Sequence, residues 1–270
     1  MKEAVAGTQA VSRALLVLRT VARSRTTGIS LAQLVRETQL NKPTAHRLLL
    51  ALIAEGMVEH DAQTVRYYIG RECYVLGGIA NERFGLGREA ADAVARLARA
   101  SGDSAFFSIR SDVFAVCVLR EDGDFPLKTH VLQPGTRHPL GVGAGSLAML
   151  AALDDGEIDR CIAENADLLK KSYPNFSVDL LKREVANTRE RGYSVNEGLV
   201  VTGSWGVAVA VHGHTGDIVG ALTIAAVESR MGPDRQPELA KKLVAEAKRL
   251  ESHLARAASM RPEGKSRAQG

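Results

Sequence analysis

Three side chains between residues 30 and 59 have the types and spacing needed to contact DNA. At about 100° per residue of a helix, Arg47 lies opposite an apolar stripe, and Thr44 and His46 flank it. A short helix with one apolar face and one basic, hydrogen-bonding face fits the DNA major groove. Taken alone, the pattern is also compatible with a plain αα-hairpin. The apolar stripe consists of Ala45, Leu48, Leu49, Leu52 and Ile53.

The segments that must position this helix carry clear helix-boundary signals. Apolar spacing predicts a first helix over residues 10–24. Ser30, followed by Gln33, is a capping-box signature for a second helix. Asn41 is a suitable N-cap for the third helix, since Pro43 then falls in its first turn, where a missing N–H costs little.

A hairpin is expected directly after the third helix. Gly56 is typical of a helix C-terminus, and short strand patterns follow at 57–60 and 65–69 around a turn at 61–64. Three helices followed by a β-hairpin predict a winged helix-turn-helix. The agreement of these independent signals favours DNA binding over a simple helical hairpin.

The charge distribution supports the same interpretation. The 270-residue chain has a net charge of +4, and residues 1–83 hold eleven basic and seven acidic residues, so they carry the whole excess. A local basic excess suits phosphate binding, although a solvated basic face would also account for it.

Several other classes of protein are disfavoured by composition. No run of about eighteen apolar residues is present, and the N-terminus lacks an apolar signal region, so we expect a cytoplasmic protein without a membrane span. Cys73, Cys117 and Cys161 are odd in number and far apart, which argues against a disulfide framework or a metal site. No catalytic constellation is apparent, so we expect neither an enzyme nor a cofactor.

The rest of the chain predicts an α+β domain with a mostly antiparallel sheet covered by helices. We expect a DNA-binding domain at 1–70, a linker helix at 71–86, a second domain at 87–258 and a disordered tail at 259–270. Helices are predicted at 88–100, 144–153, 155–171, 178–191 and 237–257, and strands at 105–109, 114–119, 127–132, 207–211 and 218–225.

Candidate ligand groups in the second domain are few. The glycine loop at 141–146 matches neither the P-loop nor the dinucleotide fingerprint, but it enters a helix. Free N–H groups at Ala144 and Gly145 could hold a carboxylate there, or the loop is a tight turn. His212 and His214 share a strand face, but turn chemistry explains them better than a metal site. His130, near a Gln-Pro-Gly turn, faces a ligand or ends a strand.

Motifs along almost the whole chain resemble the IclR family of bacterial transcriptional regulators. Each motif is short, but their order and spacing are specific. The motifs are VSRA at 11–14, LNKPTAHRLL at 40–49, EGMV at 55–58, YIG at 68–70, RGYSVNE at 191–197 and GDIVGALTI at 216–224.

This resemblance implies an N-terminal winged helix-turn-helix and a C-terminal effector-binding domain with a GAF-like fold. It also implies a homodimer, or a dimer of dimers (a homotetramer), on a partly palindromic operator in double-stranded DNA. The recognition helix would be 42–54, and Arg66 on the wing would touch the DNA backbone. The DNA-contacting residues implied in that helix are Lys42, Pro43, Thr44, His46 and Arg47.

The family's small-molecule pocket maps onto nine residues of this chain. Asn196 stands where an acidic residue is common, Gly206 where Cys or Ala occurs, and Ala225 where Ser occurs. These departures suggest a roomy, apolar pocket for a small organic acid, an aromatic one included, with its carboxylate at Ala144 and Gly145. The implied pocket residues are Leu127, His130, Ala144, Gly145, Asn196, Ser204, Gly206, Thr223 and Ala225.

The function that follows is a ligand-responsive DNA-binding regulator. Two alternatives remain open at this point: a DNA-binding protein without an effector, and an enzyme built on the second domain.

Overall fold

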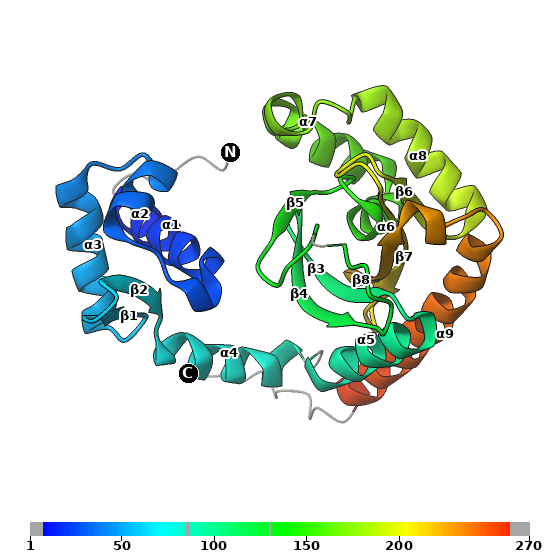
Figure 1. Ribbon diagram of the computed structural model, residues 1–270. Coiled ribbons are helices and arrows are strands. Elements are labelled where there is room, and N and C mark those ends of the chain that lie inside the picture. The colour runs from blue at the N-terminus through cyan, green and yellow to red at the C-terminus, as the bar shows by residue number, and fades with distance from the viewer. Residues whose placement is uncertain (1–7, 85–86, 130, 260–270) are drawn as a thin grey trace, which may run out of the picture. The chain divides into compact units, whose positions relative to one another are not determined.

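The computed structural model describes residues 8–84, 87–129 and 131–259, and the chain divides into two compact units, Met1–Phe84 and Gly85–Gly270 (Figure 1). The polar tail expected at 259–270 lies outside the described residues, apart from Ser259. No helix among the described residues is long and apolar enough to cross a membrane.

The first unit contains three helices and a β-hairpin in the expected order. α1 (Gln9–Arg23), α2 (Leu31–Thr38) and α3 (Lys42–Ala54) precede β1 (Val58–Asp61) and β2 (Arg66–Ile69), which pair antiparallel. A short 3-10 turn, Arg25–Thr27, joins α1 to the residues before α2. The winged helix-turn-helix is therefore confirmed. Its core is made by Val17, Val21, Ile29, Leu34, Ala45, Leu49, Val58 and Tyr67.

Both expected N-caps of this unit are formed. The Ser30 hydroxyl accepts from the Gln33 backbone N–H at 3.2 Å, and Asn41 Oδ1 accepts from the Thr44 N–H at 2.9 Å. The capping box is one-sided, because the Gln33 side chain donates to Glu37 instead of returning to Ser30. These caps fix where α2 and α3 begin, and hence which face α3 exposes.

α4 (Arg71–Phe84) follows the hairpin and belongs to the first unit. It begins at the first residue of the expected linker helix, 71–86, and continues through Gly77 and Gly78; residues 85–86 lie outside the described residues. Nothing lies within 4 Å of where a Cβ would stand at either glycine. The two glycines therefore leave a stretch of the α4 surface without side chains.

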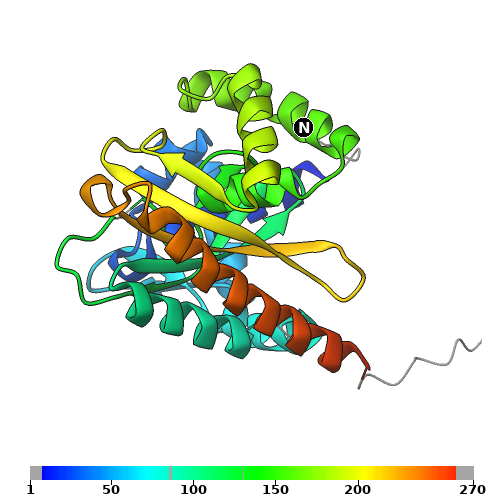
Figure 2. The ribbon, with the colours of Figure 1, turned by 90° about the vertical axis from the view of Figure 1, so that its right-hand side faces the viewer.

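The second unit is a six-stranded antiparallel sheet with helices on both faces, which confirms the α+β class (Figure 2). The strand order is β5-β4-β3-β8-β7-β6. The strands are β3 (Ser104–Ser111), β4 (Phe114–Asp122), β5 (Arg137–Pro139), β6 (Ser194–Glu197), β7 (Ser204–His212) and β8 (Ile218–Val227).

Two separate hydrophobic cores cover the two sheet faces. α5 (Gly87–Ser101) and α9 (Arg235–Ser259) pack on one face. α6 (Ala144–Ala151), α7 (Asp155–Ser172) and α8 (Val178–Arg191) cover the other. Because side chains alternate along a strand, each strand contributes to both cores.

One strand prediction for this unit is wrong, and two short strands, β5 and β6, were not predicted. Residues 127–129 and 131–132 are not a strand, and the neighbour of β4 is instead β5, with His138 opposite Ala115. The apolar residues Val131 and Leu132 are half-buried and line a cavity, so their apolar character reflects that lining position and not pairing in a sheet. β6 was not anticipated, because its four residues are too short for a clear alternation.

Candidate functional site

α3 presents one buried and one exposed face. Ala45 and Leu49 are fully buried in the core of the first unit, whereas His46 and Arg47 are exposed and Thr44 is half-buried. Lys42 and Pro43 are also exposed, in the first turn of α3. The structure thus gathers the expected DNA-contacting residues of this helix on one exposed surface.

Arg66 has a different setting from the others. Its Nη1 donates to the backbone carbonyls of Thr27 at 3.1 Å and Gly28 at 2.9 Å, and so joins strand β2 to the loop before α2. Backbone bonds between Ile29 and Tyr67 close the same junction. Arg66 therefore holds the wing in place from its base.

We expect Arg66→Ala to lower the free energy of unfolding by about 1–2 kcal/mol, because two hydrogen bonds from a charged donor are lost at a partly exposed site. A misplaced wing should also weaken binding to all duplexes by a similar factor. Chemical denaturation and fluorescence anisotropy would measure the two effects. Full stability of Arg66→Ala would contradict the hydrogen-bonding role.

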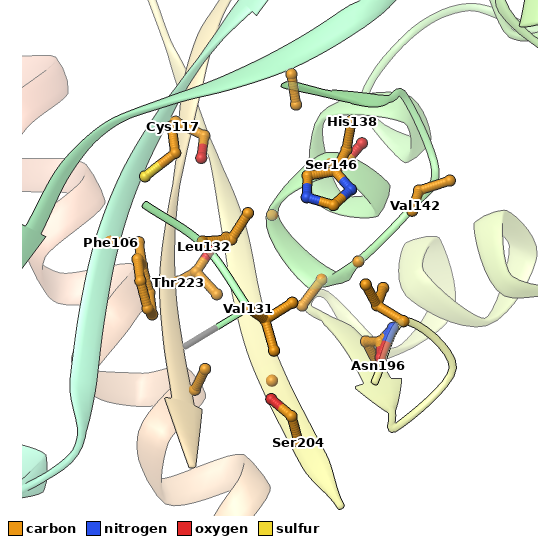
Figure 3. A pocket seen from close by; sticks show the side chains of 18 of the residues that line it. Phe106, Cys117, Val131, Leu132, His138, Val142, Ser146, Asn196, Ser204 and Thr223 are labelled. Carbon is orange, nitrogen blue, oxygen red and sulfur yellow. The ribbon is translucent and has the colours of Figure 1, made fainter. Parts of the chain in front are cut away.

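The second unit contains a cavity between α6, the loop at 129–136 and the sheet face that carries the smaller side chains (Figure 3). The space open to the centres of water-sized spheres is about 50 Å³, several times the volume that one water needs. The cavity is therefore large enough for a small ligand. The lining polar residues are Ser108, Cys117, Thr129, Thr136, His138, Ser146, Asn196, Ser204 and Thr223.

No aspartate, glutamate, lysine or arginine is among the described residues that line this cavity. Three buried polar atoms on its wall have no hydrogen-bond partner in the described part of the chain: Thr129 Oγ1, His138 Nε2 and Thr223 Oγ1. The three side chains are between 3% and 9% exposed. Buried polar groups are normally satisfied, so three unpartnered atoms around one cavity indicate a polar ligand.

The N-terminus of α6 opens onto the same cavity. Gly143, its N-cap residue, has φ +86°, a conformation that favours glycine. The backbone N–H groups of Ala144 and Gly145 lie in the first turn of α6, where the helix provides no carbonyl for them to donate to. They are therefore available to an anion. A Cβ at Gly145 would stand 2.5 Å from Thr223 Oγ1, so glycine lets the helix approach β8 closely. Ser194 Oγ donates to the Ala144 carbonyl at 2.7 Å and fixes this end of α6.

The structure brings together seven of the nine residues expected in the pocket. Leu127 is 62% exposed and does not line the cavity, because the loop carries it outward. His130 lies outside the described residues. The seven that line the cavity are Ala144, Gly145, Asn196, Ser204, Gly206, Thr223 and Ala225.

Sequence reasoning noted His138 beside the Gln133-Pro134-Gly135 turn but assigned it no role; it lines the cavity from β5. Its Nδ1 is 3.3 Å from the Tyr173 hydroxyl, and burial lowers its pKa to about 4, so the ring is neutral near pH 7. The only sequence signal was its place before the glycine loop. Alternation along the strands would also have indicated Phe106 and Ser108 beside Thr223 and Ala225.

The two histidines considered for metal binding have other surroundings. His212 Nδ1 lies 3.0 Å from Glu251 Oε1, and His214 is exposed in the turn between β7 and β8. No group of three or more potential metal ligands occurs in the part of the chain that the structure describes.

Comparisons with known proteins agree with both units. Family models described as "IclR helix-turn-helix domain" and "Bacterial transcriptional regulator IclR C-terminal" match residues 10–62 and 80–252. The chain is 27% identical to the transcriptional repressor AllR of Klebsiella pneumoniae over 232 residues, covering 85% of this chain and 84% of that protein. It is 24% identical to the transcriptional regulator BhcR of Paracoccus denitrificans over 255 residues, covering 92% and 88%.

A solved structure of an IclR transcriptional regulator from Alicyclobacillus acidocaldarius shares the fold, with a TM-score of 0.75 and 23% identity over 90% of this chain and 98% of that one. The family matches agree with the structure of both units. The first unit exposes the basic face of α3 in a winged helix-turn-helix, and the second unit contains a cavity for a small ligand. The chain belongs to the IclR family: it is a DNA-binding transcriptional regulator with an effector-binding C-terminal domain, and not an enzyme.

Proposed function

We propose that this regulator binds a partly palindromic operator as a homodimer or a dimer of dimers, and that a small organic acid controls its affinity for that operator. The observation that carries the effector assignment is the set of unpartnered buried polar atoms beside the N-terminus of α6. The alternative is a regulator whose DNA binding does not respond to a ligand.

The DNA contacts are assigned to the exposed face of α3. Arg47 suits a base edge or a phosphate, His46 and Thr44 suit bases or phosphates beside it, and Lys42 suits a phosphate. Two copies of such a helix, related by a two-fold axis, would read two half-sites about one helical turn apart. The resulting operator is an inverted repeat.

Self-association is supported by apolar side chains that the first unit leaves exposed. On α1, Val11 is 59% and Leu15 is 43% exposed, and these two residues are one helical turn apart. On α4, Tyr74 is 86% and Ile79 is 61% exposed. Grouped apolar surface of this kind is typical of protein–protein interfaces. A second copy of the chain is its natural partner in a regulator of palindromic DNA.

The effector carboxylate is assigned to the N–H groups of Ala144 and Gly145 and to Thr223 Oγ1. A helix N-terminus carries a partial positive charge, and its free N–H groups donate to anions. The remaining wall is largely apolar, with Phe106, Val142 and Val131 beside the polar groups. A short acid with an apolar body matches this lining.

Regulation requires that the effector prefer one arrangement of the second unit. We assign its transmission to α4, which leads from the wing towards the second unit. A coupling of about 1–3 kcal/mol would change operator affinity about 5- to 150-fold. The direction of that change decides whether the acid releases or recruits the regulator.

The test starts with selection of bound duplexes from a random pool by the full-length protein. We expect an inverted repeat to emerge. Anisotropy on this duplex is then measured with acetate, pyruvate and benzoate, each paired with its uncharged amide. Operator affinity should change with at least one acid and not with the amide. Selected duplexes without two-fold symmetry would contradict binding of a palindromic operator by a dimer. Unchanged operator affinity with every acid would favour the effector-independent alternative.

Thr223→Val gives a more local test of the same site. The substitution removes an unpartnered hydroxyl and keeps the shape of the side chain, so stability should be unchanged or slightly higher. Acid binding should weaken by about tenfold, since one hydrogen bond to a charged group is worth about 1.5 kcal/mol or more. Calorimetry and thermal unfolding would separate these outcomes. Thr215→Val, at an exposed turn outside the cavity, is the control for acid binding.

A further inference from the structure

The described residues that line the effector cavity include no charged side chain, so no fixed positive side-chain charge is available there to hold an anion. An ion that enters a largely apolar enclosure loses hydration, and neutral donors compensate for only part of that loss. A group that can become positive at the moment of binding would complete the site. Among the described lining residues, the titratable ones are His138 and Cys117, and only His138 gains a positive charge.

We propose that His138 is a ligand-contacting residue of the effector site, and that its imidazole takes up one proton from solvent when a small carboxylate binds against Nε2. This inference rests on the proposed function, because it takes the ligand to be an organic acid. It adds a residue, and a proton, to a site so far defined by α6 and β8.

The position of His138 supports this role. Its side chain is 9% exposed, and Nε2 is one of the three unpartnered buried atoms on the cavity wall. Ser146 Oγ donates to the carbonyl of Pro139 at 2.6 Å, so the first turn of α6 is bound to the residue next to His138. Figure 3 shows His138 and Ser146 beside each other at one end of the cavity. His138 and the N-terminus of α6 therefore line the same cavity.

Tyr173 is the side-chain hydrogen-bonding partner of the His138 ring. Its hydroxyl lies 3.3 Å from His138 Nδ1, on the side of the ring away from Nε2. When this hydroxyl donates to Nδ1, the neutral imidazole carries its hydrogen on Nε2. The empty site then presents an N–H donor to the cavity, which suits an anion and not a cation. The proton taken up on binding sits on Nδ1, and the Tyr173 hydroxyl turns to accept from it.

The surroundings of the ring make it responsive to an anion. Burial alone lowers the pKa of His138 to about 4, so the imidazole of the empty site is neutral at pH 6. Among the described residues, Tyr173 at the end of α7 and Cys117 on β4 are the titratable groups near it, and α6, the described part of the loop at 129–136 and the lining parts of β6, β7 and β8 contribute none. A bound carboxylate favours the imidazolium and raises the pKa. Between the two pKa values, binding takes up a proton, so affinity rises as the pH falls.

Calorimetry on the full-length protein would count this proton. Acetate, pyruvate and benzoate are titrated at pH 6 in two buffers of different ionisation enthalpy. We expect an uptake approaching one proton, and an affinity that rises at least about threefold from pH 7 to pH 6, tenfold being the limit for one proton. His138→Gln keeps a donor near the position of Nε2 but cannot titrate, so it should bind with no uptake. His214→Gln, at an exposed turn, should behave like the wild type.

A ligand-free measurement keeps the proposal testable if the glutamine variant does not fold. ¹⁵N NMR of the histidine rings in the wild type should show His138 neutral at pH 6, with its hydrogen on Nε2. A hydrogen on Nδ1, or a charged ring, would overturn the role of His138 alone. Binding without proton uptake, or with equal uptake in His138→Gln, would also overturn it and leave the proposed function standing. If none of the acids binds the wild type, the proposed function fails together with this inference.

Discussion

Arg47→Ala is expected to weaken operator binding by about 1–3 kcal/mol per DNA-binding unit, which is about 5- to 150-fold, while the protein stays folded. Arg47 is exposed on α3, one residue before the partly buried Leu48, so truncating it removes no core contact. Its guanidinium is suited to bidentate contact with guanine or with a phosphate. Anisotropy on the selected operator and on a scrambled duplex would measure the effect.

The comparison between the two duplexes identifies the kind of contact. A base contact would reduce affinity for the operator more than for the scrambled duplex, whereas a phosphate contact would reduce both and lower the salt slope by about one. Arg99→Ala, exposed on α5 in the second unit, is the matched control and should leave DNA binding unchanged. If Arg47→Ala binds the operator with wild-type affinity, α3 is not the reading element that we propose.

Asp103→Ala is expected to lower the free energy of unfolding of the second unit by about 3–5 kcal/mol, a large part of the stability of an ordinary domain. Asp103 is 2% exposed and immediately precedes β3. Its carboxylate accepts from Arg230 Nε at 2.9 Å and from Arg235 Nη2 at 2.5 Å. Both arginines also donate to the Ser101 carbonyl.

The physical reason is that alanine removes the anion and leaves two guanidinium groups beside a buried position. The arginine side chains keep 28% and 24% exposure, so water recovers part of the loss and the lower end of the range applies. Chemical denaturation would measure the change. Asp159→Ala, which breaks an exposed pair with Lys182, should cost no more than about 1 kcal/mol. A loss of that size in Asp103→Ala would show that the cluster is not a structural anchor.

Local signals were sufficient to predict the first unit. Ser30 and Asn41 satisfy N–H groups only a few residues away, and the apolar stripe of α3 reports directly which face is buried. Helix caps and helical periodicity depend on residues close together in sequence. They can therefore be identified without knowing which distant residues pack nearby. The exposed position of Arg47 follows from the same periodicity.

The second unit was predicted less completely, because its sheet depends on pairing between distant residues. The run at 127–132 is apolar enough for a strand, but β4 pairs with Arg137–Pro139 instead. An apolar run in the sequence indicates contact with the protein interior, but it does not indicate whether the backbone pairs with another strand. The resemblance placed Leu127 in the pocket, where the folded loop turns it outward.

The sequence by itself determined the family, the two-part organisation and the basic face of α3, since motif order, periodicity and charge are properties of the linear chain. Only the tertiary structure decided that Arg66 holds the wing to the loop before α2, and that His138 closes the cavity. Both roles depend on atoms brought together from residues 35 or more apart, His138 and Tyr173 among them. Such juxtapositions, and the polar atoms they leave unpartnered, exist only once the chain has folded.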